Sequence, residues 1–440
     1  MLFNSHIFIL LFLPLLLAGW YFLNWKKKFQ LAQGYLIGMS LWFYAYANLQ
    51  YLWLLLFSCL IGWLLSCLPE KISSEKGKKV LTGVGCVFHL GLLGYFKYSN
   101  FFLENLNTVF HTDFPMLQIL LPVGISFYTF QQLAYLIDRC RGDAPRDSFF
   151  DYLTFMVYFP QLLQGPILLR SEFMGQLKEP ERRRFHAERF SEGIQFFVFG
   201  LAKKVLLADT LAKAVNYGYS NVSMLDSISA LLLAVGYLTE LYFDFSGYCD
   251  MAVGLGKMIG LEVAENFDAP FHSASVKEFW RRWHMTLGRF FTRYVYIPLG
   301  GNRRGKMGTL CNVMIVMLLS GLWHGAAWTF VLWGFLHGVG MIWDNLEHPH
   351  LPKKWMRQAA TFAYVCMTFV FFRAESIAQG IDVLKSIVSL KWNGFVFQMA
   401  SALDMTECYI ITKALSMKLP GLLSWFWLGI FVVLIAICFR

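Results

Sequence analysis

Residues 277–306 read KEFWRRWHMTLGRFFTRYVYIPLGGNRRGK, and an apolar run leads from them to the sequence LLSGLWHGAAW at residues 318–328. The first part holds eight Lys or Arg residues and one acidic residue, Glu278. Its aromatic residues recur at helical spacing, which predicts an amphipathic helix over residues 273–294 at a membrane surface. In the apolar part, His324 is the ionisable residue, and such a side chain inside a membrane span is costly enough to indicate function. Another histidine, His284, lies at the edge of the apolar arc of the predicted surface helix.

The composition places the whole chain in a lipid bilayer. Of its 440 residues, 57% are hydrophobic and 15% are charged, whereas soluble proteins carry about 25% charged residues. Apolar runs recur along the chain with no long polar segment between them. We therefore expect an all-α, polytopic membrane protein with about 10 to 12 transmembrane or re-entrant helices, which form a single domain over residues 1–440. The net charge of +10 fits basic cytoplasmic loops, and no nucleic-acid partner is expected.

Loop charges predict the orientation of the first spans. The basic loops at residues 26–28, 71–79 and 138–147 are expected in the cytoplasm, and the acidic stretch at residues 101–115 outside. The first 28 residues carry their Lys residues after the apolar run, so we expect an uncleaved first span and no signal peptide. The nine cysteines include no C-x-x-C pair, so neither disulfides nor a metal site is expected.

The apolar run at residues 149–169 does not fit a simple crossing, because basic loops precede and follow it. Pro160, Gly165 and Pro166 interrupt any helix there, which predicts a re-entrant segment. Broken backbone at membrane depth is tolerated where it is buried in protein or lines a watery cavity. Two short interfacial helices without a cavity are the alternative. Gln161 lies at this break and is a candidate cavity residue.

Charged side chains also occur within later apolar stretches. Lys203 and Lys204 fall in the middle of a long predicted helix, where they either snorkel or face polar groups. For Asp244, a structural salt bridge and a place in a cavity wall are equally consistent with the sequence. His337, on the hairpin after His324, is interpreted as a buried packing histidine, whereas the glycines and tryptophans around His324 favour a functional pocket.

Several motifs together resemble the membrane-bound O-acyltransferase family. They are FYTFQQLAYLIDRCRG (127–142), PQLLQGPI (160–167), FDFSGYCDMAVGLGKMIGL (243–261), ENFDAPF (265–271), the stretch 278–305 and GLWHGAAWTF (321–330). The likeness covers about three quarters of the chain and is strongest to the bacterial branch, which serves alginate and peptidoglycan O-acetylation and teichoic acid D-alanylation. It implies a helical funnel through the membrane, an essential histidine at His324 and another at His284. Arg293 is a departure, since alginate-type members often have an acidic residue there.

The chemistry of acyl transfer agrees with these assignments. A hydroxyl that attacks a thioester must lose its proton, and neutral imidazole is well matched to that task near pH 7. We expect His324 to be the base and His284 to orient the donor. The residues expected to bind substrate or line the funnel are Trp280, Arg281, Trp283, Trp323, Asp244, Asn266 and Gln161.

The resemblance also implies the substrates and partners. No bound cofactor is expected, and the donor is expected to be acetyl-CoA or, as an alternative, an acyl carrier protein thioester. The basic surface helix would attract such an anionic donor at the cytoplasmic face, although binding to anionic lipid explains its charge equally well. The acceptor is expected to be a cell-surface polysaccharide, reached through an extracytoplasmic transferase of the SGNH-hydrolase type, and the location is the bacterial cytoplasmic membrane. D-alanyl transfer to teichoic acid, or a non-catalytic transporter or scaffold of polymer export, are the alternatives.

Overall fold

The computed structural model describes residues 1–346 and 352–439, and these residues are overwhelmingly helical. Among them, strand pairing is limited to an isolated bridge between Phe267 and Trp283. The chain packs as two compact units whose segments alternate along the sequence. Unit 1 contains residues 1–199, 248–266 and 286–295, and unit 2 contains residues 200–247, 267–285 and 296–440.

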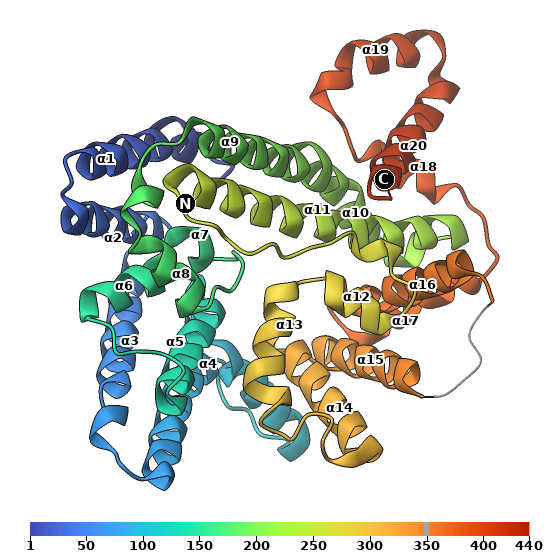
Figure 1. Ribbon diagram of the computed structural model, residues 1–440. Coiled ribbons are helices and arrows are strands. Elements are labelled where there is room, and N and C mark those ends of the chain that lie inside the picture. Colours follow the sequence, from blue (N-terminus) through green and yellow to red (C-terminus); the bar gives the residue numbers. More distant parts are fainter. Residues whose placement is uncertain (347–351, 440) are drawn as a thin grey trace. The chain divides into compact units, whose positions relative to one another are not determined.

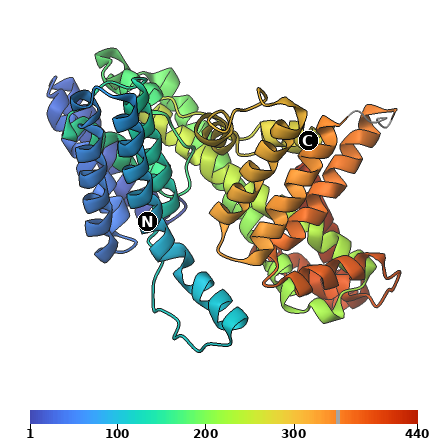
Figure 2. The same ribbon diagram turned by 90° about the horizontal axis from the view of Figure 1, so that it is seen from below.

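Unit 1 is built mainly from the first half of the chain. Helices α2 to α5 pack side by side in it (Figures 1 and 2). Its helices are α1 (Leu13–Trp25, preceded by a π-helical turn at Phe8–Phe12), α2 (Phe29–Ala45), α3 (Gln50–Ser66), α4 (Glu75–Phe110), α5 (Ile125–Arg141), α6 (Phe149–Val157), α7 (Phe159–Leu162), α8 (Arg170–Leu177), most of α9 (Ala187–Ala202), the end of α11 (Ser227–Ile259) and most of α13 (Met285–Phe291).

Unit 2 is built around a helical hairpin, α14–α15, against which α16 packs (Figure 1). Its helices are a π-helical stretch (Lys203–Ala208), α10 (Asp209–Ser220), the first part of α11, α12 (Val276–Arg282), α14 (Gly305–His324), α15 (Trp328–Asn345), α16 (Lys354–Arg373), α17 (Ile377–Val388), α18 (Phe395–Ser401), α19 (Tyr409–Lys418) and α20 (Pro420–Ile437).

Helices long and apolar enough to cross a membrane occur in both units. Within the described residues there are six such segments: Phe8–Trp25, Gln50–Lys71, Glu75–Phe110, Ser227–Ile259, Gly305–His324 and Pro420–Ile437. Further helices form in other apolar stretches of the chain, but they are shorter or less apolar than these six segments; they are α2, α5, α15 and α16. The all-α, multi-pass prediction is therefore confirmed, whereas a single domain over residues 1–440 stays a prediction.

Two predicted boundaries were wrong. The stretch at residues 101–110, expected as an external loop, is the end of α4, because neither proline nor glycine interrupts that helix between Gly94 and its end at Phe110. At 36 residues, α4 is about 54 Å long, much longer than the hydrocarbon core of about 30 Å. The apolar run at residues 119–137 predicts a span that starts near Ile119, but the helix begins at Ile125, since Gly124 takes a left-handed conformation after Pro122.

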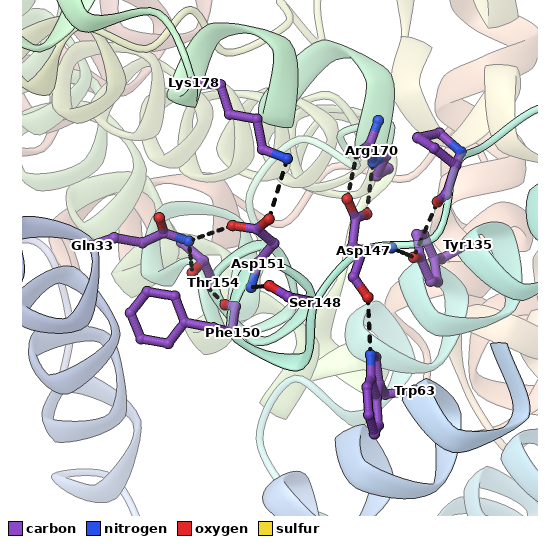
Figure 3. A network of polar contacts seen from close by, with 11 residues as sticks. Gln33, Trp63, Tyr135, Asp147, Ser148, Phe150, Asp151, Thr154, Arg170 and Lys178 are labelled. Atoms are coloured by element: carbon purple, nitrogen blue, oxygen red, sulfur yellow. Dashed lines mark hydrogen bonds and ion pairs between the residues drawn. The ribbon is translucent and has the colours of Figure 1, made fainter. Parts of the chain in front are cut away.

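The break predicted in the run 149–169 is present. Helix α6 ends at Val157, the short α7 covers Phe159–Leu162, and residues 163–169 are not helical. Both ends of the run are fixed by a polar network (Figure 3). Its contacts join Ser148 Oγ to Asp151 N (3.1 Å), Gln33 Nε2 to Asp151 Oδ1 (2.9 Å), Lys178 Nζ to Asp151 Oδ2 (3.2 Å), Arg170 Nε to Asp147 Oδ2 (2.7 Å) and Trp63 Nε1 to Asp147 O (3.1 Å). The broken segment is thus held firmly against α2, α3 and α8.

Candidate functional site

His324 is the last residue of α14. The helix ends there because the backbone of Gly325 is fully extended. Residues 325–327 connect it to α15, which starts at Trp328. Two glycines allow the two helices of the hairpin to touch: the Cα atom of Gly334 lies 3.3 Å from where a Cβ atom on Gly321 would be. The imidazole of His324 is half-buried, with the rings of Trp333 and Phe372 at centroid distances of 5.2 and 5.1 Å. The hairpin and α16 therefore hold this side chain in an aromatic enclosure.

His284 lies where the predicted surface helix breaks. A single helix over residues 273–294 was expected, but α12 ends at Arg282 and α13 starts at Met285. The break arises because His284 has a φ of 47°, in the left-handed region, which costs a non-glycine residue about 1–2 kcal/mol. Such strain persists only where surrounding contacts enforce it, and it is common at functional sites.

The break turns the His284 ring into the protein. The residue is 1% exposed, and its ring packs edge-on against Phe245 at 4.7 Å. Burial lowers the pKa of His284 to about 3, because a charged imidazolium is disfavoured away from water. At neutral pH, His284 is therefore an uncharged imidazole with one N–H donor and one acceptor nitrogen.

The structure brings the two imidazoles together, although 40 positions separate them in the sequence. Their ring centroids are 6.5 Å apart, and both residues belong to unit 2. Trp323 lies beside both rings, at 6.1 Å from His284 and 4.8 Å from His324. A single reacting group that makes a hydrogen bond of about 3 Å to each ring would span such a separation.

The other candidate residues of unit 2 occupy different places. Trp283 is buried and stacks on Phe279 at 5.3 Å, and a role of Trp283 in binding substrate stays a prediction. Trp280 donates its indole N–H to His337 (3.2 Å), and Arg281 is exposed on α12. Asp244 forms an ion pair with Lys204 at 2.6 Å, which favours the salt-bridge interpretation and explains how this lysine is accommodated in the middle of the helical stretch.

Asn266 and Gln161 belong to unit 1 and have local structural contacts there. The side-chain oxygen of Asn266 accepts hydrogen bonds from the backbone N–H (3.1 Å) and the hydroxyl (2.9 Å) of Thr286. Gln161 is 1% exposed and donates to the carbonyl oxygen of Phe155. These contacts hold irregular backbone in place, and a role of either residue in binding substrate stays a prediction.

Three residues near the histidine pair were not anticipated: Phe245, Trp333 and Phe372. Nothing in the sequence singles them out, because aromatic residues are abundant in every apolar run of this chain. Arg293, the noted departure, pairs with Asp138 at 3.0 Å and Asp143 at 3.3 Å within unit 1. Across residues 1–346 and 352–439, no three His, Cys, Asp or Glu side chains gather in a way that would hold a metal ion.

Comparisons of the sequence with a family model and with known proteins all indicate the same family. The family model described as "MBOAT, membrane-bound O-acyltransferase family" matches residues 141–380. The peptidoglycan O-acetyltransferase of Helicobacter pylori is 36% identical over 423 residues, which cover 89% of this chain and 80% of that protein. A probable alginate O-acetylase of Azotobacter vinelandii is 39% identical over 389 residues, covering 86% of this chain and 76% of that protein.

A third relative modifies another polymer. The teichoic acid D-alanyltransferase of Bacillus subtilis is 28% identical over 271 residues, covering 58% of this chain and 69% of that protein. The family model and the two acetylating relatives together cover both histidine motifs and most of the chain. The chain therefore belongs to the membrane-bound O-acyltransferase family and is a multi-pass membrane enzyme that transfers acyl groups to hydroxyls.

Proposed function

We propose that this enzyme takes an acetyl group from acetyl-CoA at the cytoplasmic face of the bacterial cytoplasmic membrane and passes it outward to a hydroxyl. The final acceptor is a cell-surface polysaccharide, reached through an extracytoplasmic transferase of the SGNH-hydrolase type. The observation that carries the proposal is the convergence of two imidazoles, 6.5 Å apart, within a membrane protein. A funnel between the helices would let the donor stay in the cytosol.

His324 is the general base in this mechanism. As the acceptor oxygen attacks the thioester carbonyl carbon, the hydroxyl proton moves to a ring nitrogen of His324, and the C–O bond forms. The tetrahedral intermediate then breaks its C–S bond, and the proton returns to the leaving thiolate. Because His324 is the C-terminal residue of α14, the partial negative charge at that helix end stabilises the transient imidazolium.

His284 orients the donor and stabilises the charge that develops on the thioester oxygen. Its burial keeps the ring neutral, so the ring carries one N–H, which donates to the carbonyl oxygen as that oxygen becomes an oxyanion. The strained backbone at residue 284 sets the direction of that N–H before substrate arrives. Such preorganised donors are usually a large part of catalysis in acyl transfer.

The relatives favour acetyl transfer over D-alanyl transfer. Similarity to the two O-acetyl-transferring relatives extends over 86–89% of this chain, whereas similarity to the teichoic acid D-alanyltransferases covers 54–58%. A D-alanyl carrier protein is nevertheless an alternative donor, and the experiment below distinguishes the two. The two acetylating relatives are named for different polymers, peptidoglycan and alginate.

The test uses the full chain in lipid nanodiscs, together with its co-purified partner proteins. Labelled acetyl-CoA and a D-alanyl carrier protein are offered separately, and release of free thiol is measured. We expect cleavage of acetyl-CoA, and we expect kcat to fall about 10²- to 10⁴-fold in His324→Ala, the range typical for loss of a positioned base. Wild-type protein that cleaves neither donor, or a His324→Ala variant with normal kcat, would refute the proposal. Mass spectrometry of surface glycans with and without the protein identifies the polymer.

A further inference from the structure

His337 is fully buried on α15 and has a hydrogen bond at each ring nitrogen. Trp280 Nε1 lies 3.2 Å from Nδ1, and Thr368 Oγ1 lies 2.9 Å from Nε2. The Thr368 hydroxyl also donates to the carbonyl oxygen of Val365 at 2.8 Å. The ring thus joins α12, through Trp280, to α16, through Thr368.

These partners determine which nitrogen of His337 carries the proton. An indole N–H can only donate, so Nδ1 must be the bare, accepting nitrogen. The single proton of the neutral ring is then on Nε2 and points at Thr368 Oγ1, whose own hydrogen is directed to Val365 O. In this series of hydrogen bonds from Trp280 to Val365, every donor meets an acceptor. Protonation of Nδ1 would place two N–H groups face to face, so the contact with Trp280 requires the neutral ring.

The hydrogen bond to Trp280 is one of the polar anchors between α12 and α15. Lys277 provides the others: its backbone N–H donates to Asp344 at 2.8 Å, and its ammonium donates to Asn345 Oδ1 at 3.0 Å. His337 and Asp344 are seven positions apart on α15, and Lys277 and Trp280 are three apart on α12, so each pair shares one face of its helix. Helix α12 has only seven residues and would be unstable alone. Its position therefore depends on these anchors and on the packing of its buried face.

The anchors matter because each helix they join leads to one of the two site histidines. The chain continues from α12 through Trp283 to His284, while α15 packs closely on α14, which ends at His324. The indole of Trp333 contacts the rings of both His337 and His324, at centroid distances of 4.8 and 5.2 Å. All of these residues belong to unit 2.

We propose that His337 is a positioning residue, which acts through Trp280 to hold α12 on α15 and so sets the separation of the His284 and His324 imidazoles. The inference rests on the proposed roles of these two histidines. It assigns Trp280 to this clamp and not to substrate binding. The hydrogen bond at Nδ1 carries the effect, while the one at Nε2 keeps the ring in the required tautomer.

Two substitutions separate the ring nitrogens of His337. In His337→Asn the side-chain oxygen lies near the position of Nδ1 and can still accept from Trp280. In His337→Gln the amide lies near the position of Nε2, so Thr368 keeps a partner and Trp280 loses its acceptor. Because a displacement of about 1 Å at the reacting groups can cost about 10²-fold in rate, we expect kcat for acetyl-CoA cleavage to fall about 10- to 100-fold in His337→Gln, with little change in KM. His337→Asn should recover most of that loss.

Trp280→Phe tests the other end of the same bond. It should lower kcat as much as His337→Gln does, and the double variant should be no worse than either single variant. Tyr364→Phe is the matched control, because it removes a hydrogen bond from α16 to the carbonyl oxygen of Leu336 on α15 (2.6 Å) without touching α12. It should lower thermal stability and leave kcat within about 2-fold of wild type, as expected for a bond that orients no reacting group.

Hydrogen exchange tests the clamp without relying on activity. With full-length protein in nanodiscs, His337→Gln and Trp280→Phe should raise amide exchange in residues 276–282 and leave residues 305–324 unchanged, whereas His337→Asn should not. Equal exchange and equal kcat in the Asn and Gln variants would overturn the proposal. If exchange changes as expected but wild-type protein cleaves no acetyl-CoA, the clamp stands and the proposed donor is wrong.

Discussion

Replacement of Gly321 by alanine tests how closely the α14–α15 hairpin controls the site. An added Cβ atom would overlap the carbonyl oxygen of Phe330 and lie 3.3 Å from the Cα atom of Gly334. Since non-bonded atoms prefer separations of about 3.5–4.0 Å, the two helices must move apart by about 1 Å. The obstruction is backbone, which cannot rotate away as a side chain can. Overpacking of this kind typically costs about 1–3 kcal/mol.

The separation of the two helices should also displace the His324 imidazole, because His324 is three residues beyond Gly321 on the same helix. A misplacement of about 1 Å is expected to lower kcat about 10²-fold. The assay measures acetyl-CoA cleavage and thermal unfolding in nanodiscs for Gly321→Ala beside Gly91→Ala. Gly91 lies in α4, and an added Cβ there meets nothing within 4 Å, so this control should keep its activity and gain up to about 1 kcal/mol from better helix propensity. Similar stability and activity in the two variants would refute the close-packing argument.

Further predictions concern the strained turn, its ionisation and the start of α11. His284→Gly and His284→Ala should both lose kcat, but the glycine variant should be more stable by about 1–2 kcal/mol in thermal unfolding, because glycine accepts a positive φ without strain; equal stability would mean that the turn relaxes. Because burial lowers the pKa of His284 to about 3, the ring stays neutral between about pH 5 and 8, so His284→Gln should lower kcat/KM by a factor that does not change with pH in that range; a factor that changes with pH would mean that His284 titrates there. Burial pushes the pKa of Asp226 up, but N–H groups of Ser229 and residues 393–394 outweigh it and hold the pKa below its ordinary value. The carboxylate therefore stabilises the fold above the unfolded pKa of about 3.9 and loses that effect as pH falls through the lower, folded value, so the deficit of Asp226→Asn in thermal unfolding should shrink toward acid pH; a deficit independent of pH would contradict this account.

Sequence patterns sufficed where a local rule applies. Apolar runs of spanning length predicted most of the long helices, and Pro160 and Gly165 predicted the broken run between α6 and α8. The predicted end of a helix was wrong where the helix continues beyond its apolar run, as in α4. Prediction also failed at His284, because helical periodicity continues through a residue whose backbone tertiary contacts force into the left-handed region. No local propensity signals such a turn in advance.

By itself, the sequence determined that this chain is a helical membrane protein and that two of its histidines stand in motifs resembling those of O-acyltransferases. It could do so because bilayer insertion depends on the length and polarity of contiguous segments, which are local properties. Only the tertiary structure decided that His284 and His324 approach to 6.5 Å, that Asp244 is paired with Lys204, and that Trp280 binds His337. Contacts across 40 or more positions depend on how helices pack, and close packing through Gly321 and Gly334 is set by surfaces that no single segment contains.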